Sequence, residues 1–285
     1  MGANREYKDS VFRMLFKEPE NARELYQGLT GETAALEDIH IDPVGGVFTS
    51  ELKHDVAFRV GNRLLFLIEH MSTSNRNMPV RMLIGAAEFY HRYIKSLGKR
   101  AIHRKQRLSL PAPEFLLFTN GRAAKDGEGE MRLSEAFGGK GALELVVRVY
   151  DVRYDSGQQL LKKCPVLEGY SLLVHQVEQG KAQGLGDEAA IRRAILFCKE
   201  NNILSKFLER NNEEVQQAMM FEWSMEDALE ARREDGLEEG REEGREEANL
   251  SAVRNLMRNL HLNAQQAMDA LNIPVVERGK LEAQL

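Results

Sequence analysis

The stretch after residue 53 constrains the fold most, because it combines two apolar runs with a tight turn between them. The runs 55–60 and 64–70 predict two strands, and Gly61-Asn62-Arg63 supplies the turn of a β-hairpin. Apolar residues occupy both alternating faces of each run. This pattern is typical of strands that other elements cover on both sides.

The same hairpin predicts a metal site. If the hairpin is centred on Asn62, Asp55 lies directly opposite Glu69, and directly opposed side chains share a face of the sheet. Two carboxylates close together in an apolar sheet repel each other and are costly to desolvate, so they favour binding of a cation. The alternative is that both acids lie at strand ends in water.

Position 71 is where such a site would need a further polar group, because it lies two residues after Glu69 on the same face. In a metal-dependent hydrolytic site, a Lys or Gln at this position would orient the water molecule that attacks the substrate. The residue is instead Met71, whose thioether cannot orient water at a magnesium centre. In an unbulged register Lys53 lies opposite position 71 and would supply an ammonium group there. The alternative is an edge lysine in solvent. The backbone carbonyl of His70 is expected as a further oxygen ligand.

The order of the other elements predicts an α/β fold. A helix is expected over 7–29, with a break near Pro19, and a second helix follows Pro79. Two further strands are expected at the apolar run 115–118 and at the valine-rich run 143–150.

The chain becomes purely helical after residue 187, and its charge changes there as well. Between Glu226 and Ala248 there are eleven acids and four arginines, a local charge of −7, so with an overall net charge of −5 the remainder of the chain carries about +2. Gly236, Gly240 and Gly244 recur every fourth residue in this segment, which predicts a solvated spacer helix or, alternatively, a specific coiled interaction.

The composition indicates the cellular compartment in which the protein is expected. The two cysteines give neither a disulfide framework nor a metal-ligand spacing, which is typical of a cytosolic protein. The polar N-terminus does not resemble a secretory signal, and no apolar run reaches membrane-spanning length. We therefore expect a cytoplasmic protein without membrane contact.

Several motifs, taken in order, resemble the recombination-promoting nuclease (Rpn) family, a transposase-like branch of the PD-(D/E)XK nucleases. The resemblance covers nearly the whole chain, and the motifs that carry it are Lys8-Asp-Ser-Val-Phe, Asp55-Val-Ala-Phe, Leu67-Ile-Glu-His-Met-Ser-Thr, Asn77-Met-Pro-Val-Arg-Met, Phe118-Thr-Asn-Gly, Cys164-Pro-Val-Leu-Glu-Gly-Tyr-Ser-Leu, Glu200-Asn-Asn-Ile-Leu-Ser-Lys-Phe-Leu and the Glu-Glu-Gly-Arg repeat.

The resemblance implies a restriction-endonuclease-like core of mixed sheet flanked by helices, DNA as substrate, and Mg²⁺ or another divalent cation such as Mn²⁺ or Ca²⁺. By position, Asp55 and Glu69 match the two metal-binding acids of the family, whereas Met71 departs from its Gln. Glu20 or Glu24 would serve as an additional acid beside the metal.

These observations together predict a nuclease-like domain over 1–182, a helical subdomain over 183–224, a charged helix over 225–249 and a small helical unit over 250–285. The last two would also mediate homo-oligomerisation. Positively charged residues expected to contact DNA phosphates are Arg76, Arg81, Arg92, Lys95, Lys99, Arg100, Arg104, Lys105 and Arg107.

We expect a metal-dependent DNA endonuclease with Asp55, Glu69 and Lys53 as its catalytic residues. Because Met71 replaces the expected Gln or Lys, the alternative is a catalytically silent protein of the same fold that binds DNA or another protein.

Overall fold

The computed structural model describes residues 10–42, 55–70, 76–98, 100–120 and 129–285. It divides into two compact units, Met1–Ser224 and Met225–Leu285, which are considered separately. Side chains outside the description include those of Asp55, Phe66 and residues 68–70.

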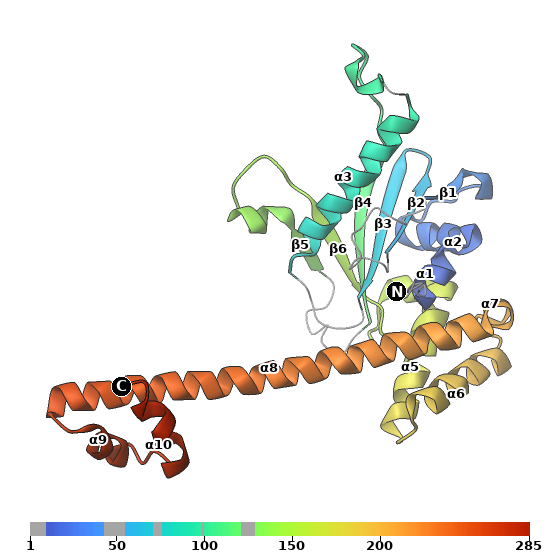
Figure 1. The fold of residues 1–285 in the computed structure, drawn as a ribbon. Coiled ribbons are helices and arrows are strands. Elements are labelled where there is room, and N and C mark those ends of the chain that lie inside the picture. The colour runs from blue at the N-terminus through green and yellow to red at the C-terminus, as the bar shows by residue number, and fades with distance from the viewer. Residues whose placement is uncertain (1–9, 43–54, 71–75, 99, 121–128) are drawn as a thin grey trace, which may run out of the picture. The chain divides into compact units, whose positions relative to one another are not determined.

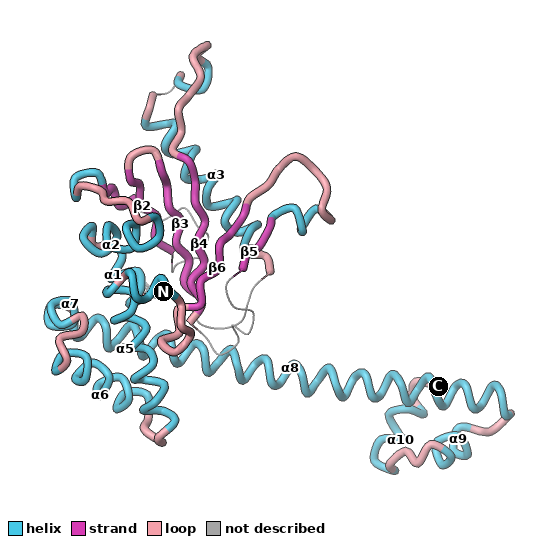
Figure 2. The backbone as a smooth tube through the Cα atoms, turned by 180° about the vertical axis from the view of Figure 1, so that it is seen from behind, coloured by secondary structure: helices cyan, strands magenta, loops and turns pink. Residues whose placement is uncertain are grey.

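A six-stranded mixed sheet forms the centre of the first unit (Figures 1 and 2). Its strand order is β1-β2-β3-β4-β6-β5. The strands β1, β2 and β3 form an antiparallel meander, β3, β4 and β6 run parallel, and β5 is antiparallel to β6. The strands are β1 (Ile39–Asp42), β2 (Asp55–Val60), β3 (Arg63–His70), β4 (Ala112–Thr119), β5 (Gly129–Arg132) and β6 (Val146–Asp151).

Helices cover both faces of this sheet, which confirms the predicted α/β fold with a mixed sheet flanked by helices. On one face, Val56 and Phe58 of β2 belong to the same buried cluster as residues of α1 (Val11–Phe16), α2 (Pro19–Thr30) and α5 (Pro165–Ala182). On the other face, Ala57 of β2 packs with residues of α3 (Met78–Ser96). The strand is therefore apolar on both sides because both sides are covered.

The predicted helix boundaries near prolines are also confirmed. The chain breaks between α1 and α2 at Pro19, and Pro79 occupies the first turn of α3. Gly31 ends α2 in the left-handed conformation with φ 73°, which glycine adopts without steric cost.

Shorter helices complete the first unit. They are η1 (Leu36–Asp38), η2 (Ala101–His103), η3 (Leu133–Phe137), α4 (Gln159–Lys163), α6 (Asp187–Glu200) and α7 (Ser205–Arg210). Ile191 of α6 and Phe207 of α7 belong to the same buried cluster as the sheet face beside α5. The helices from the predicted 183–224 subdomain thus contribute to the core of the first unit.

The second unit has a small core of its own. It contains the C-terminal part of α8 (Asn212–Leu260) together with α9 (Ala264–Ala270) and α10 (Val275–Glu282). Val253 and four other apolar residues, Ala267, Met268, Ile273 and Leu281, form that core. Asn263 caps α9 in a reciprocal capping box with Gln266, as its sequence position predicts. Within the described ranges, no helix has both the length and the hydrophobicity needed to span a membrane.

Candidate active site and nucleic-acid interface

The hairpin of β2 and β3 forms as predicted, but its register is shifted by one residue. Val60 pairs with Arg63 across a two-residue loop, so Asp55 pairs with Ile68 and not with Glu69. The prediction of direct opposition between the two acids is therefore wrong. The physical reason is the loop: a two-residue connection with Gly61 first fits the twist of the strands better than a turn centred on Asn62.

The predicted catalytic and metal-binding groups remain predictions. The side chains of Asp55, Glu69 and His70 and the whole of Lys53 and Met71 lie outside the described part of the structure. The backbone nevertheless places Asp55 at the start of β2 and Glu69 beside the end of β3, one residue beyond the partner of Asp55.

This end of the sheet is also where the parallel strands finish. His70 of β3 pairs with Thr119 of β4, and Thr119 pairs with Asp151 of β6. The backbone N–H of Val152 donates to the carbonyl of Thr119 at 2.9 Å, which holds the two strand ends together. Ligands of α/β sheets bind at the carboxyl ends of such strands.

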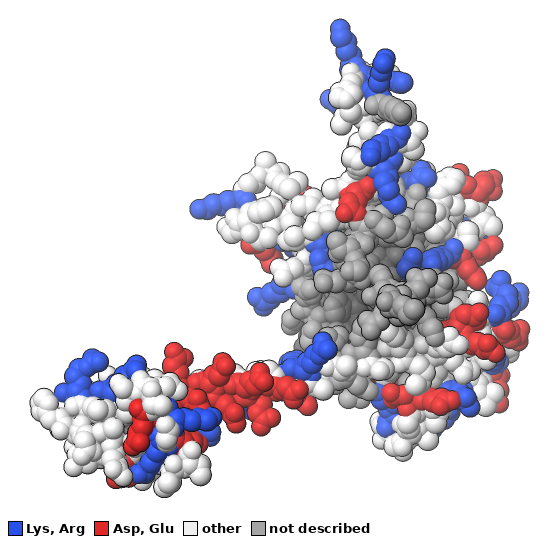
Figure 3. All heavy atoms as spheres, viewed as in Figure 1, with Lys and Arg blue, Asp and Glu red and all other residues white. Residues whose placement is uncertain are grey.

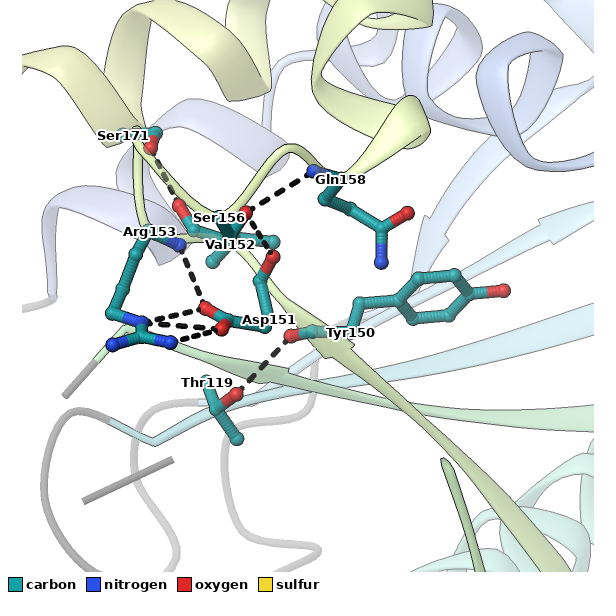
Figure 4. Close-up of polar contacts among 8 residues, drawn as sticks. All are labelled: Thr119, Tyr150, Asp151, Val152, Arg153, Ser156, Gln158 and Ser171. Carbon is teal, nitrogen blue, oxygen red and sulfur yellow. Dashed lines mark hydrogen bonds and ion pairs between the residues drawn. The ribbon is translucent and has the colours of Figure 1, made fainter. Parts of the chain in front are cut away.

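Asp151 is buried at this edge and is held by Arg153 (Figure 4). The Nε of Arg153 donates to the two carboxylate oxygens of Asp151 at 3.0 and 3.1 Å, and its Nη2 donates to Oδ2 at 2.5 Å. The backbone N–H of Arg153 donates to Oδ1 as well. The hydrogen bonds to Asp151 raise the pKa of Arg153, and the two side chains form a fixed ion pair.

The loop after β6 is fixed by a chain of hydrogen bonds (Figure 4). The hydroxyl of Ser156 donates to the carbonyl of Asp151 at 3.0 Å and accepts from the backbone N–H of Gln158. The hydroxyl of Ser171 in α5 donates to the carbonyl of Val152. The end of β6 is therefore tied to the helical layer on one face of the sheet.

Two buried amides near these strand ends have unused donors. Asn120 directly follows β4 and is 3% exposed, and its Nδ2 has no hydrogen-bond partner among the residues that the structure describes. Gln158 is also buried, and within the same described ranges its Nε2 has none either. A buried donor without an acceptor costs about 1–3 kcal/mol, so such groups need an explanation. The sequence gives Asn120 only as part of the Phe118-Thr-Asn-Gly motif, and its burial depends on residues far away in the chain.

Glu20 and Glu24, the two candidates for an additional acid beside the metal, differ in their hydrogen-bond partners and exposure. Glu24 accepts a hydrogen bond from the backbone N–H of Val166 at 2.7 Å, which satisfies a donor in the first turn of α5. Its second partner is the thiol of Cys164 at 3.6 Å. Glu24 thus has a structural partner, whereas Glu20 is exposed on α2. Among the described side chains, no group of three His, Cys, Asp or Glu residues could hold a metal ion.

The predicted DNA-contacting residues are divided between two places. Arg76 and Arg81 flank the start of α3, and Lys99 lies outside the described residues. The others lie on the second half of α3 and the segment after it, where Lys and Arg gather in Figure 3: Arg92, Lys95, Arg100, Arg104, Lys105 and Arg107. We call the described residues from 92 to 107 the basic arm.

The base of the basic arm is anchored to the sheet. The hydroxyl of Tyr90 donates to the carbonyl of Pro111 at 2.5 Å, and burial raises the pKa of Tyr90 to about 12. The guanidinium of Arg59 in β2 lies 5.4 Å from the ring centre of Tyr93, a cation–π distance. The arm itself projects beyond the strands (Figure 1), and its charged side chains are exposed.

Comparison of the chain with family models, with curated proteins and with solved structures finds no match.

Proposed function

We propose that the protein is a divalent-metal-dependent DNA endonuclease of the recombination-promoting type, with a PD-(D/E)XK core. The observation that carries the proposal is the position of two acids on hydrogen-bonded neighbouring strands: Asp55 begins β2, and Glu69 lies near the end of β3. The carboxyl ends of β4 and β6 lie at the same edge. A mixed sheet with helices on both faces is also the core that the sequence resemblance implies.

The donor set fits a hard cation. Asp55, Glu69 and the backbone carbonyl of His70 offer oxygen ligands only, which Mg²⁺, Mn²⁺ and Ca²⁺ prefer. A bound divalent ion would lower the pKa of a water molecule and polarise a phosphate oxygen. Asn120 has a free amide donor beside the end of β3, and it would orient a phosphate or water oxygen there. The observed register removes the argument that Lys53 lies opposite position 71, and Lys53 lies outside the described residues, so its role in steering the attacking water stays a prediction.

The basic arm would hold the DNA backbone. Its arginines and lysines are exposed, and their charges would neutralise phosphates along a duplex. This contact carries no sequence information by itself, so the protein would bind many DNA sequences.

The nuclease proposal is tested by incubating plasmid DNA with the protein and Mg²⁺ or Mn²⁺. We expect the parent to cleave the plasmid. In Asp55→Ala and Glu69→Ala the cleavage rate should fall by more than the roughly 10–100-fold effect of removing an outer-shell partner of a metal site. Glu37→Ala is the matched control, because Glu37 is an exposed acid of η1, next to the end of β2 at Val60 and not to the end at Asp55. Equal cleavage by all four proteins would show that these acids do not bind a catalytic ion.

A second candidate function is a catalytically silent DNA-binding protein of the same fold. Two observations favour it. Met71 replaces the expected Gln or Lys. In the observed register Glu69 is one residue out of opposition with Asp55, and in a regular strand pair such positions belong to opposite faces of the sheet. This candidate predicts binding of duplex DNA without cleavage by the parent and by Asp55→Ala alike. Cleavage that appears only in Met71→Gln would show that the missing amide is what silences the site.

A further inference from the structure

Two of the sequence motifs that the proposed function leaves unexplained meet at one groove. The segment 164–172 begins α5, and the segment 200–208 contains α7 with the turn before it. Both segments line a groove with a volume of about 1250 Å³, together with the junction of α1 and α2. We call it the α2–α5–α7 groove. Its volume exceeds the roughly 300–1,000 Å³ of typical small-molecule pockets, so a larger occupant fits it better.

The turn that contains Ile203 and Leu204 forms part of the groove wall and is held by close contacts. Leu204 has φ 52°, a left-handed conformation that is uncommon for a bulky residue. Its side chain packs against Gly169 of α5 so closely that a Cβ at Gly169 would lie 3.0 Å from Cγ of Leu204. The backbone N–H of Ile203 donates to the carbonyl of Cys198 at 2.8 Å, which fixes the turn to the end of α6.

The groove combines apolar surface with an excess of acids. Val166, Leu172 and Ile203 are partly exposed apolar residues of its lining. Four glutamates and two cations line it: Glu18, Glu20, Glu168, Glu209, Lys206 and Arg210. Glu18 forms an ion pair with Arg210, whereas the other three glutamates have no ion-pair partner among the described residues. A fitting occupant therefore carries aliphatic side chains together with positive charges.

The basic arm has that composition. Ile102 is 64% exposed and Leu97 is 42% exposed, so both aliphatic side chains are accessible for contact with a partner. Exposed positive charges surround them, among them Arg100, Arg104 and Lys105. Within one molecule the arm projects from the end of α3 that lies away from α5 and α7 (Figures 1 and 2).

We propose that the basic arm of one molecule docks into the α2–α5–α7 groove of a second copy. The arm and the groove are different surfaces, so the contact is head-to-tail, and it adds further copies unless the rotation closes a ring. The proposal does not rest on the nuclease function, because it uses neither Asp55 nor Glu69.

The first test measures the average mass of the full-length protein by light scattering as its concentration rises. We expect the mass to rise beyond that of a monomer, and to fall again at high salt because the opposed charges are exposed. Ile102→Asp should weaken the association at least about tenfold. Leu196→Asp is the control, since Leu196 is a 57% exposed aliphatic residue of α6 that belongs to neither the arm nor the groove lining. Association that Ile102→Asp leaves unchanged would overturn the proposal.

The second test exchanges the charges between the two surfaces. One variant reverses the groove (Glu168→Lys with Glu209→Lys), and the other reverses the arm (Arg100→Glu, Arg104→Glu, Lys105→Glu and Arg107→Glu), because changing only two of its six described cations would leave the arm positive. We expect each variant alone to remain monomeric, because groove and arm then have the same sign. Mixing the two should restore association, since each reversed surface meets its complement. A folded pair of variants that stays monomeric on mixing, or a parent that never associates, would overturn the proposal.

Discussion

At the residue scale, the buried side-chain amide of Asn120 lowers the stability of the fold and is proposed to contact a ligand. Its buried Nδ2 has no partner in the described part of the chain, so it destabilises the folded state relative to an apolar residue of similar size. Natural proteins retain such costs mainly at sites that bind something.

Asn120→Leu is therefore expected to raise the free energy of unfolding by about 1 kcal/mol, because the unpaired donor is removed. DNA cleavage, or DNA binding in a silent protein, should fall in the same variant. Chemical denaturation and the plasmid assay measure the two effects. A variant that is less stable and fully active would show that Asn120 has only a packing role.

The two buried cysteines predict a dependence of stability on alkaline pH. Burial raises the pKa of Cys164 and of Cys198 from 9.0 to about 12. Above pH 9 the unfolded chain loses thiol protons that the folded chain keeps, so stability present below pH 9 is lost as the pH rises toward 12.

We expect the double variant Cys164→Ala with Cys198→Ala to lose less stability than the parent between pH 9 and pH 12. Its stability at neutral pH will be lower, because two buried side chains are truncated, and the comparison is therefore one of slopes. Urea denaturation at several pH values provides the measurement. Identical slopes would mean that the thiols ionise in the folded protein as readily as in the unfolded chain.

At the scale of elements, the glycines of two helices have opposite roles. In α5, a Cβ at Gly169 would meet Leu204 at 3.0 Å and Ile203 at 3.2 Å. In α8, a Cβ at Gly236 would meet nothing within 4 Å. Both residues lie inside helices, so helix propensity alone would favour alanine equally at both.

Gly169→Ala should therefore destabilise the first unit by about 1–3 kcal/mol through overpacking. Gly236→Ala should stabilise α8 by about 0.5–1 kcal/mol, because alanine restricts the unfolded chain more than glycine does. Thermal unfolding followed by circular dichroism measures both changes. If Gly169→Ala were as well tolerated as Gly236→Ala, the turn at 201–204 would not be packed on α5 as described.

At the scale of the whole molecule, one surface has two proposed partners. The basic arm would bind DNA phosphates, and it would also bind the acidic groove of a second copy. The two contacts use the same charges, so they compete.

Binding of short duplex DNA is expected to lower the average number of protein copies per complex, because the DNA covers the basic arm. Analytical ultracentrifugation with labelled DNA separates the two kinds of complex. If saturating DNA left protein self-association unchanged, the arm would contact only one of the two partners.

The sequence alone determined much of the layered fold. Apolar runs on both faces of 55–60 and 64–70 indicated covered strands, and Pro19 and Pro79 located the helix starts, because these signals act within a few residues. The acidic composition of 226–248 likewise indicated an exposed helix, and that segment lies within α8.

Only the tertiary structure decided the hairpin register, the roles of Glu24 and Asn120, and the existence of the α2–α5–α7 groove. One residue in a loop shifts every pair of a hairpin, and local sequence does not fix the loop length closely enough. Burial of an amide and the meeting of segments 164–172 and 200–208 depend on residues far apart in the chain. Local patterns specify elements, whereas the packing of distant elements determines which side chains become partners.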